Sequence, residues 1–137
     1  MFVTRQTRST SADPRYESGE VSAETVLTVP IVFLVMLIAI QTAVFMHTAH
    51  VAQVSATEGA AAAARYGGGV AAGAEATARA IAELRSTATD IPKVNIVGGF
   101  AEVQVGLRVP RVAPFFDFVV TRSAREPLER FVAPDQR

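Results

Sequence analysis

The stretch GEVSAETVLTVPIVFLVMLIAI, residues 19–40, decides the fold because it joins two glutamates, Glu20 and Glu24, to a long apolar run. That run covers residues 26–46 almost without interruption, and residues 25–57 contain no Asp, Glu, Lys or Arg. About 20 consecutive apolar residues span a bilayer core as a helix, whereas a soluble helix of this length would keep a polar face. The sequence therefore predicts one membrane-spanning helix over about residues 26–46.

The composition argues against several classes of function. The chain has 137 residues, with 13 basic and 13 acidic side chains and no cysteine. A net charge of zero gives no basic field for nucleic acid, and the absence of cysteine excludes disulfides and zinc–thiolate sites. No nucleophile–base pair, phosphate loop or paired catalytic carboxylates stand out. We therefore expect no enzyme activity, cofactor, small-molecule substrate or nucleic-acid partner. His47 and His50 have no acid close by in the sequence, so we interpret them as interfacial residues rather than metal ligands.

Basic residues are placed unevenly around the predicted span. Three arginines precede it closely: Arg5, Arg8 and Arg15. The first basic residue after it is Arg65. Because arginines near a span hold their end in the cytoplasm, we expect residues 1–19 to form a cytoplasmic leader. Residues 67–137 then form a small head outside the cytoplasm.

Two helices are expected. The first lies in the region of residues 20–66. It starts near Ser22, with Glu24 in its first turn, and stops at the three glycines of positions 67–69. The second covers residues 70–87 and is amphipathic.

Alanines recur every four positions along the outer half of the first helix: Ala52, Ala56, Ala60 and Ala64. Small residues at this spacing form a flat stripe on which another helix can pack closely. Alanine is also simply a good helix former, and that explanation stays open.

The pattern changes from helix to strand after residue 92. Residues 93–97 and 103–109 alternate between apolar and polar side chains on either side of Gly98-Gly99, which predicts a β-hairpin. Three aromatic residues that could cover it follow: Phe115, Phe116 and Phe118. A third short strand over residues 118–121 and a frayed tail from Pro127 complete an α+β fold.

A resemblance rests on Gly19 followed by Glu20-Val21-Ser22-Ala23-Glu24 and an apolar helix, which is similar to the processing signal of type IV pilins. Pro30, six residues after Glu24, resembles the TadE-like minor pilins or pseudopilins of tight-adherence systems. The sequence Ala56-Thr57-Glu58-Gly59-Ala60, with Arg65 after it, is also similar to the REGARAAA region of that family.

This resemblance implies a structural function. A prepilin peptidase would cut between Gly19 and Glu20, and Glu24 would act in assembly with other pilin or pilus-assembly subunits. The chain would be found in the cell membrane and then in a pilus at the cell surface. An alternative stays open, namely an uncleaved single-pass anchor that presents a small interaction domain outside the cytoplasm. A secretory signal peptide is disfavoured because the apolar run is too long.

Overall fold

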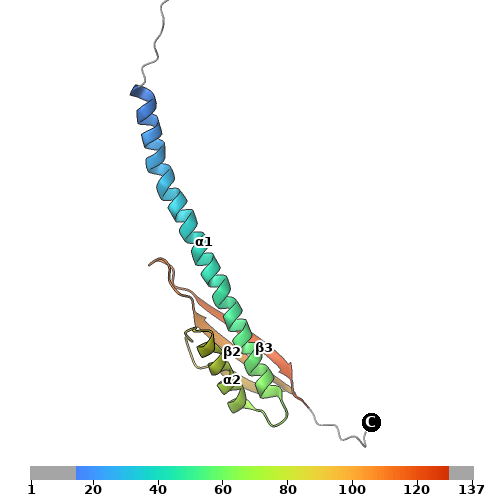
Figure 1. Ribbon diagram of the computed structural model, residues 1–137. Coiled ribbons are helices and arrows are strands. Elements are labelled where there is room, and N and C mark those ends of the chain that lie inside the picture. The colour runs from blue at the N-terminus through green and yellow to red at the C-terminus, as the bar shows by residue number, and fades with distance from the viewer. Residues whose placement is uncertain (1–14, 130–137) are drawn as a thin grey trace, which may run out of the picture. The chain divides into compact units, whose positions relative to one another are not determined.

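The computed structural model describes the backbone of residues 15–129 and the side chains of residues 24–129. The described part contains two helices, α1 (Arg15–Ala64) and α2 (Val70–Glu83), and three strands, β1 (Lys93–Val97), β2 (Phe100–Arg108) and β3 (Val119–Pro127) (Figure 1). The chain divides at Met36 into two compact units, which are described separately below. Most of the predicted leader, including Arg5 and Arg8, lies outside the described residues, as does the tail from residue 130.

Helix α1 begins earlier than the sequence predicted. It starts at Arg15 rather than near Ser22, so the Gly19–Glu20 bond lies in helical backbone. Arg15, Glu17 and Glu20 favour a helix in this stretch, and its single glycine costs only about 0.5–1 kcal/mol. Pro30 lies inside the helix. The end at Ala64 is two residues before the predicted one, and Gly67 and Gly69 follow it with positive φ.

Helix α2 ends at Glu83, four residues before the predicted end. Arg85 adopts a left-handed φ of 51°, a conformation that glycine usually takes after a helix. The backbone N–H of Arg85 donates to the Ala82 carbonyl at 3.0 Å, and that of Ser86 donates to the Ile81 carbonyl at 3.0 Å. These two bonds close the helix without a glycine, which is why the sequence did not reveal its end.

The three strands form one antiparallel sheet in the order β1-β2-β3. The predicted hairpin is confirmed: Val97 pairs with Phe100 across Gly98 and Gly99, whose φ angles are 61° and 81°. Strand β3 is longer than predicted, because β2 continues to pair with it as far as Pro127.

The chain does not fray at Pro127. The Leu128 N–H donates to the Gly99 carbonyl at 2.9 Å, and the Glu129 N–H donates to the Ala64 carbonyl at 2.8 Å. These bonds hold the end of β3 to the hairpin turn and to the end of α1.

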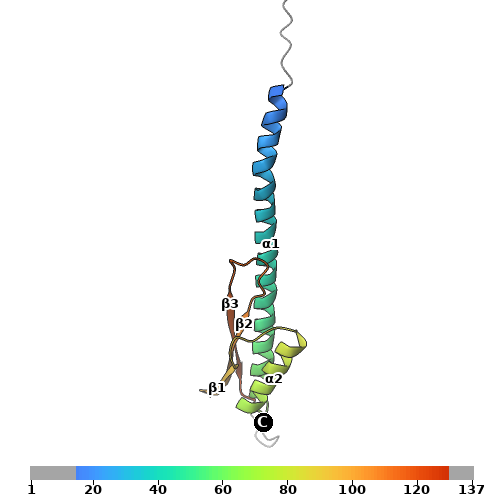
Figure 2. The same cartoon turned by 90° about the vertical axis from the view of Figure 1, so that its left-hand side faces the viewer.

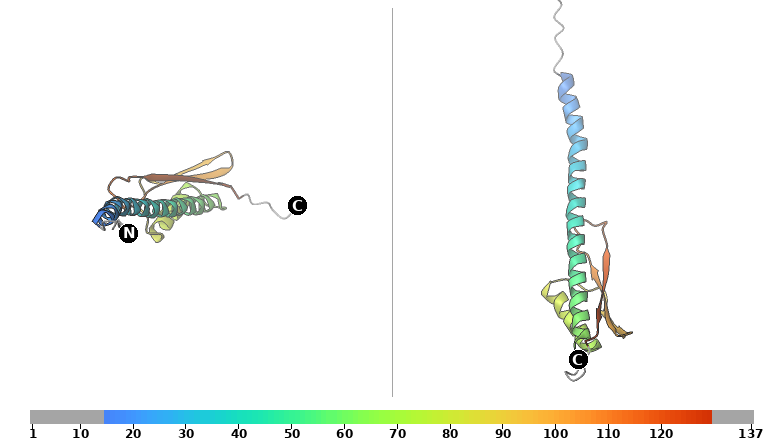
Figure 3. Two further views of the ribbon diagram at one scale, coloured as in Figure 1. Left: turned by 90° about the horizontal axis from the view of Figure 1, so that it is seen from above. Right: turned by 90° about the vertical axis from the view of Figure 1, so that its right-hand side faces the viewer.

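Strand β2 packs along the second half of α1. Ala101 clusters with Ala63 and Ala64, whereas Pro110, just past β2, accepts a hydrogen bond from Gln41. A strand advances about 30 Å over residues 101–110, close to the roughly 35 Å that a helix advances from residue 41 to residue 64. The sheet and α2 lie on different sides of this part of α1 (Figures 2 and 3). The α+β fold is thus built around the second half of the first helix.

Candidate functional site on the N-terminal helix

The first part of α1 presents an apolar surface. Val26 and Leu27 are each 68% exposed, and nine further large apolar side chains before Gln41 are exposed: Val29, Ile31, Val32, Phe33, Leu34, Val35, Met36, Ile38 and Ile40. Among the described residues, this is the one helix with the length and composition to cross a membrane. Such a surface is suited to lipid or to the apolar surfaces of other helices.

The expected processing and assembly residues lie in the first turns of α1. Gly19 and Glu20 are in helical backbone, and Glu20 precedes Glu24 by four residues, which is about one turn. The Glu24 side chain is exposed at the edge of the apolar surface. A peptidase that needs an extended substrate would have to unwind the turn that contains the Gly19–Glu20 bond.

The alanine stripe is covered by the chain's own head. Ala52, Ala56 and Ala60 are fully buried, and Ala64 is 5% exposed. Ala52, Ala56 and Ala60 share a core with the inward-facing residues of the sheet: Val103, Val105, Leu107, Val109 and Val120. In this structure the sheet packs on the alanine stripe, whereas the sequence predicted that a helix could pack there.

A close approach of two helices does occur, at Gly59 on α1 and Gly73 on α2. A Cβ atom added to Gly59 would overlap the Thr77 hydroxyl, and one added to Gly73 would lie 2.8 Å from the Ala63 Cβ. Thr77 is fully buried, and its hydroxyl donates to the Gly73 carbonyl at 2.8 Å. In the sequence, Gly59 is part of the family-like segment of residues 56–60, and no local pattern there indicates that α2 crosses α1.

Gln41 connects the predicted span to the far end of the sheet. Its side chain is 4% exposed, its Nε2 donates to the Pro110 carbonyl at 3.4 Å, and its Oε1 accepts from the Val112 N–H at 3.0 Å. In the sequence, Gln41 is one of the few polar residues in the apolar run of residues 26–46. A clue to its role is that an amide side chain within a predicted membrane span needs hydrogen-bond partners from the protein itself.

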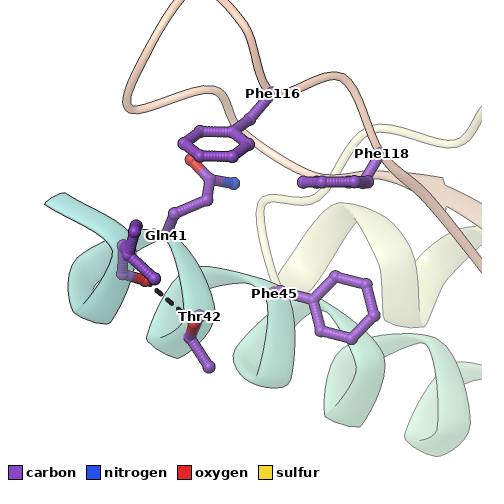
Figure 4. Close-up of a pocket in the computed structure, with 6 residues that line it drawn as sticks. Gln41, Thr42, Phe45, Phe116 and Phe118 are labelled. Atoms are coloured by element: carbon purple, nitrogen blue, oxygen red, sulfur yellow. Dashed lines mark hydrogen bonds between the residues drawn. The ribbon is translucent and has the colours of Figure 1, made fainter. Parts of the chain in front are cut away.

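Aromatic rings gather above Gln41. Phe45 meets Phe118 edge to face with centroids 6.2 Å apart, and Phe116 stacks on Phe118 at 5.8 Å. With Ile38 and Thr42, these residues line an open cavity of about 360 Å³ (Figure 4). The Thr42 hydroxyl donates to the Ile38 carbonyl at 2.8 Å, so it presents no free donor to the cavity. The cavity is almost entirely apolar in character.

Within the described residues 24–129, charged and metal-ligating side chains do not gather into a second site. His47 and His50 are exposed, and no three His, Cys, Asp or Glu side chains come together as potential metal ligands within residues 24–129. Arg108 and Asp117 form an ion pair of 3.3 Å at the base of the segment that carries the phenylalanines.

Comparison with known proteins connects the helix to a family. The model of the TadE-like protein family matches residues 19–65, about a third of the chain, from the glycine of the expected processing site to the end of α1. No curated protein and no solved structure matches the chain significantly. The matched family is a pilin-like structural family related to pilus assembly, and it is not an enzyme family. Over residues 19–65, the chain is therefore similar to the TadE-like protein family.

Proposed function

We propose that this chain is a minor pilin or pseudopilin that a prepilin peptidase processes between Gly19 and Glu20. The processed chain would enter, or initiate, a tight-adherence-type pilus through contacts of its N-terminal helix with other subunits. The observation that carries the proposal is the family match over residues 19–65, which covers the Gly19 motif, Glu24 and the exposed apolar surface of α1.

Glu24 would act after processing. Removal of the leader gives Glu20 a new α-ammonium group about one turn before the Glu24 carboxylate. In the pilin family that this chain resembles, such a glutamate pairs with the N-terminus of a neighbouring subunit and sets the register of assembly. A carboxylate and an ammonium group are each costly in a poorly solvated place and compensate each other when paired.

The mature N-terminus tests the proposal directly. Wild-type protein from cells that make the peptidase should begin at Glu20, whereas Gly19→Val should remain a full-length precursor, because a β-branched side chain cannot replace glycine in a narrow cleft. Gly106→Ala is a suitable control for expression and insertion, since a Cβ atom there would lie 3.9 Å from its nearest neighbours. Recovery of wild-type protein that still begins at Met1 would reject processing at this bond.

A second function is supported by the helical backbone at Gly19 and Glu20, which a peptidase would first have to unwind. An intact chain would be a single-pass anchor, with the sheet and α2 as an interaction domain outside the cytoplasm. The same N-terminal sequencing separates the two functions, because the anchor keeps Met1.

The orientation can be tested by labelling the head. Val97 is 72% exposed beside the hairpin turn, and the chain has no cysteine of its own. In intact cells, Val97→Cys should react with a membrane-impermeant maleimide added outside the cytoplasmic membrane. Protection until the cells are lysed would reverse the proposed orientation.

A further inference from the structure

The segment between β2 and β3, residues 109–118, carries an exposed apolar surface and is called here the aromatic loop. Its exposed apolar side chains are Val112 (41%), Phe115 (79%) and Phe118 (43%). The loop contains two prolines, and between Arg111 and Asp117 it has no charged residue. We infer that the aromatic loop lies in the headgroup–acyl boundary of the membrane, with Phe115 in contact with lipid.

The position of the loop along α1 supports this inference. Phe116 and Phe118 line a cavity with Ile38, Gln41, Thr42 and Phe45 (Figure 4). These four α1 residues belong to the predicted span, residues 26–46. At about 1.5 Å per residue, they lie roughly 2–12 Å inside its outer end. A loop packed against them reaches the same depth.

Several polar groups at this depth are paired within the protein, which lowers the cost of a place beside lipid. The Gln41 amide bonds Pro110 and Val112 of the loop. The Val109 N–H donates to the Phe118 carbonyl at 2.9 Å, and the Phe116 N–H donates to the Ala113 carbonyl at 3.2 Å. The prolines have no N–H group to satisfy.

The charged groups at the edge of the loop fit a boundary position rather than the hydrocarbon core. Asp117 pairs with Arg108 at 3.3 Å, and both side chains are about half exposed. Arg111 is exposed, where it can reach lipid phosphate groups. Exposed phenylalanine side chains with charged side chains beside them match the mixed polarity of the headgroup–acyl boundary.

This inference rests on the membrane-anchored state of the proposed function and not on cleavage or pilus assembly. It is tested with the full chain in phosphatidylcholine vesicles, using single cysteines that carry an environment-sensitive fluorophore. Phe115→Cys reports on the loop. Val97→Cys is the matched control, because it is an apolar residue of similar exposure at the other end of the sheet. Ile31→Cys, which lies inside the predicted span and away from its outer end, reports on insertion.

Lipids that carry a spin label near the headgroup should quench the fluorophore at 115 and not at 97, and emission at 115 should shift to the blue. Lipids labelled near the methyl end of the acyl chain should quench position 31 most strongly. Equal quenching at 115 and 97, with 31 quenched, would overturn the inference while leaving the anchor intact. An unquenched position 31 would overturn both. Val112→Cys provides a second loop position if Phe115→Cys does not fold.

Discussion

The crossing of α2 over α1 at Gly59 gives the sharpest prediction about what holds the head together. In Gly59→Ala, the new methyl group would overlap the Thr77 hydroxyl and lie 3.1 Å from the Gly73 carbonyl oxygen. Thr77 is fully buried, so its side chain cannot turn out into solvent. Either α2 moves away from α1, or Thr77 changes rotamer and loses its bond to Gly73.

The expected magnitude follows from two opposing effects. Overpacking a buried contact costs about 1–3 kcal/mol. Replacing a glycine inside a helix returns about 0.5–1 kcal/mol. Gly59→Ala should therefore lower the free energy of unfolding by about 1–2 kcal/mol. In a unit of this size, that corresponds to a fall in Tm of roughly 5–15 °C.

A double-mutant cycle distinguishes this contact from general damage to the helix. Thr77→Ala removes the overlapping hydroxyl, so adding Gly59→Ala to it should cost little or should stabilise the protein. Thermal unfolding of the four proteins, followed by circular dichroism in detergent, gives the coupling energy, expected at about 1–3 kcal/mol. Gly106→Ala is the control substitution outside the crossing. If Gly59→Ala were equally harmful with and without Thr77, the proposed contact would not be its cause.

Three further predictions concern assembly, the loop and the sheet. Glu24→Ala and Glu24→Gln should insert and be cleaved but fail to co-purify with the pilus system. Glu58→Gln, which changes an exposed acid on the same helix, should behave like wild type. Normal co-purification of both Glu24 variants would leave Glu24 only a stabilising effect of about 0.3–1 kcal/mol at the start of the helix. Gln41→Leu should lower the free energy of unfolding by about 1–3 kcal/mol and speed hydrogen exchange at the Val112 N–H, which loses its acceptor. Thr42→Val should not speed this exchange, because the Thr42 hydroxyl bonds only within α1. Unchanged exchange in Gln41→Leu would contradict the hydrogen bond between Gln41 and Val112. Val103→Pro should abolish the sheet, because Val103 is paired with both Val94 and Ala124 and is fully buried, and a protease-resistant head in this variant would count against the strand order.

The elements that the sequence predicted well are those whose pattern is local. The apolar run gave α1, and alternation around Gly98 and Gly99 gave the hairpin. Strand β3 was underestimated because its own pattern is irregular. Arg122 lies opposite Val105 on the inner face yet remains exposed, with its guanidinium bonded to the Thr121 carbonyl. Only the partner strand β2 shows that β3 continues to Pro127.

The contacts that the sequence did not predict join residues far apart in the chain. Gln41 and Val112 are separated by 71 positions, and no sequence pattern near either residue predicts their contact. The alanine stripe was visible in the sequence, but small residues accept a helix and a sheet equally well. Which of the two covers Ala56 depends on the tertiary fold.

The regular spacing of that stripe has a mechanical consequence. A slide of α1 by four residues, about 6 Å, would replace each alanine under the sheet by the next one. The alanines alone therefore resist axial slip only weakly. Slip is blocked at the two ends, where Gln41 holds Pro110 and Val112, and where the Ala64 carbonyl accepts from the Glu129 N–H. When tension is applied along α1, these terminal bonds and the interlock of Gly59 with Thr77 would bear the load first, and their rupture would set the force at which the head releases the helix.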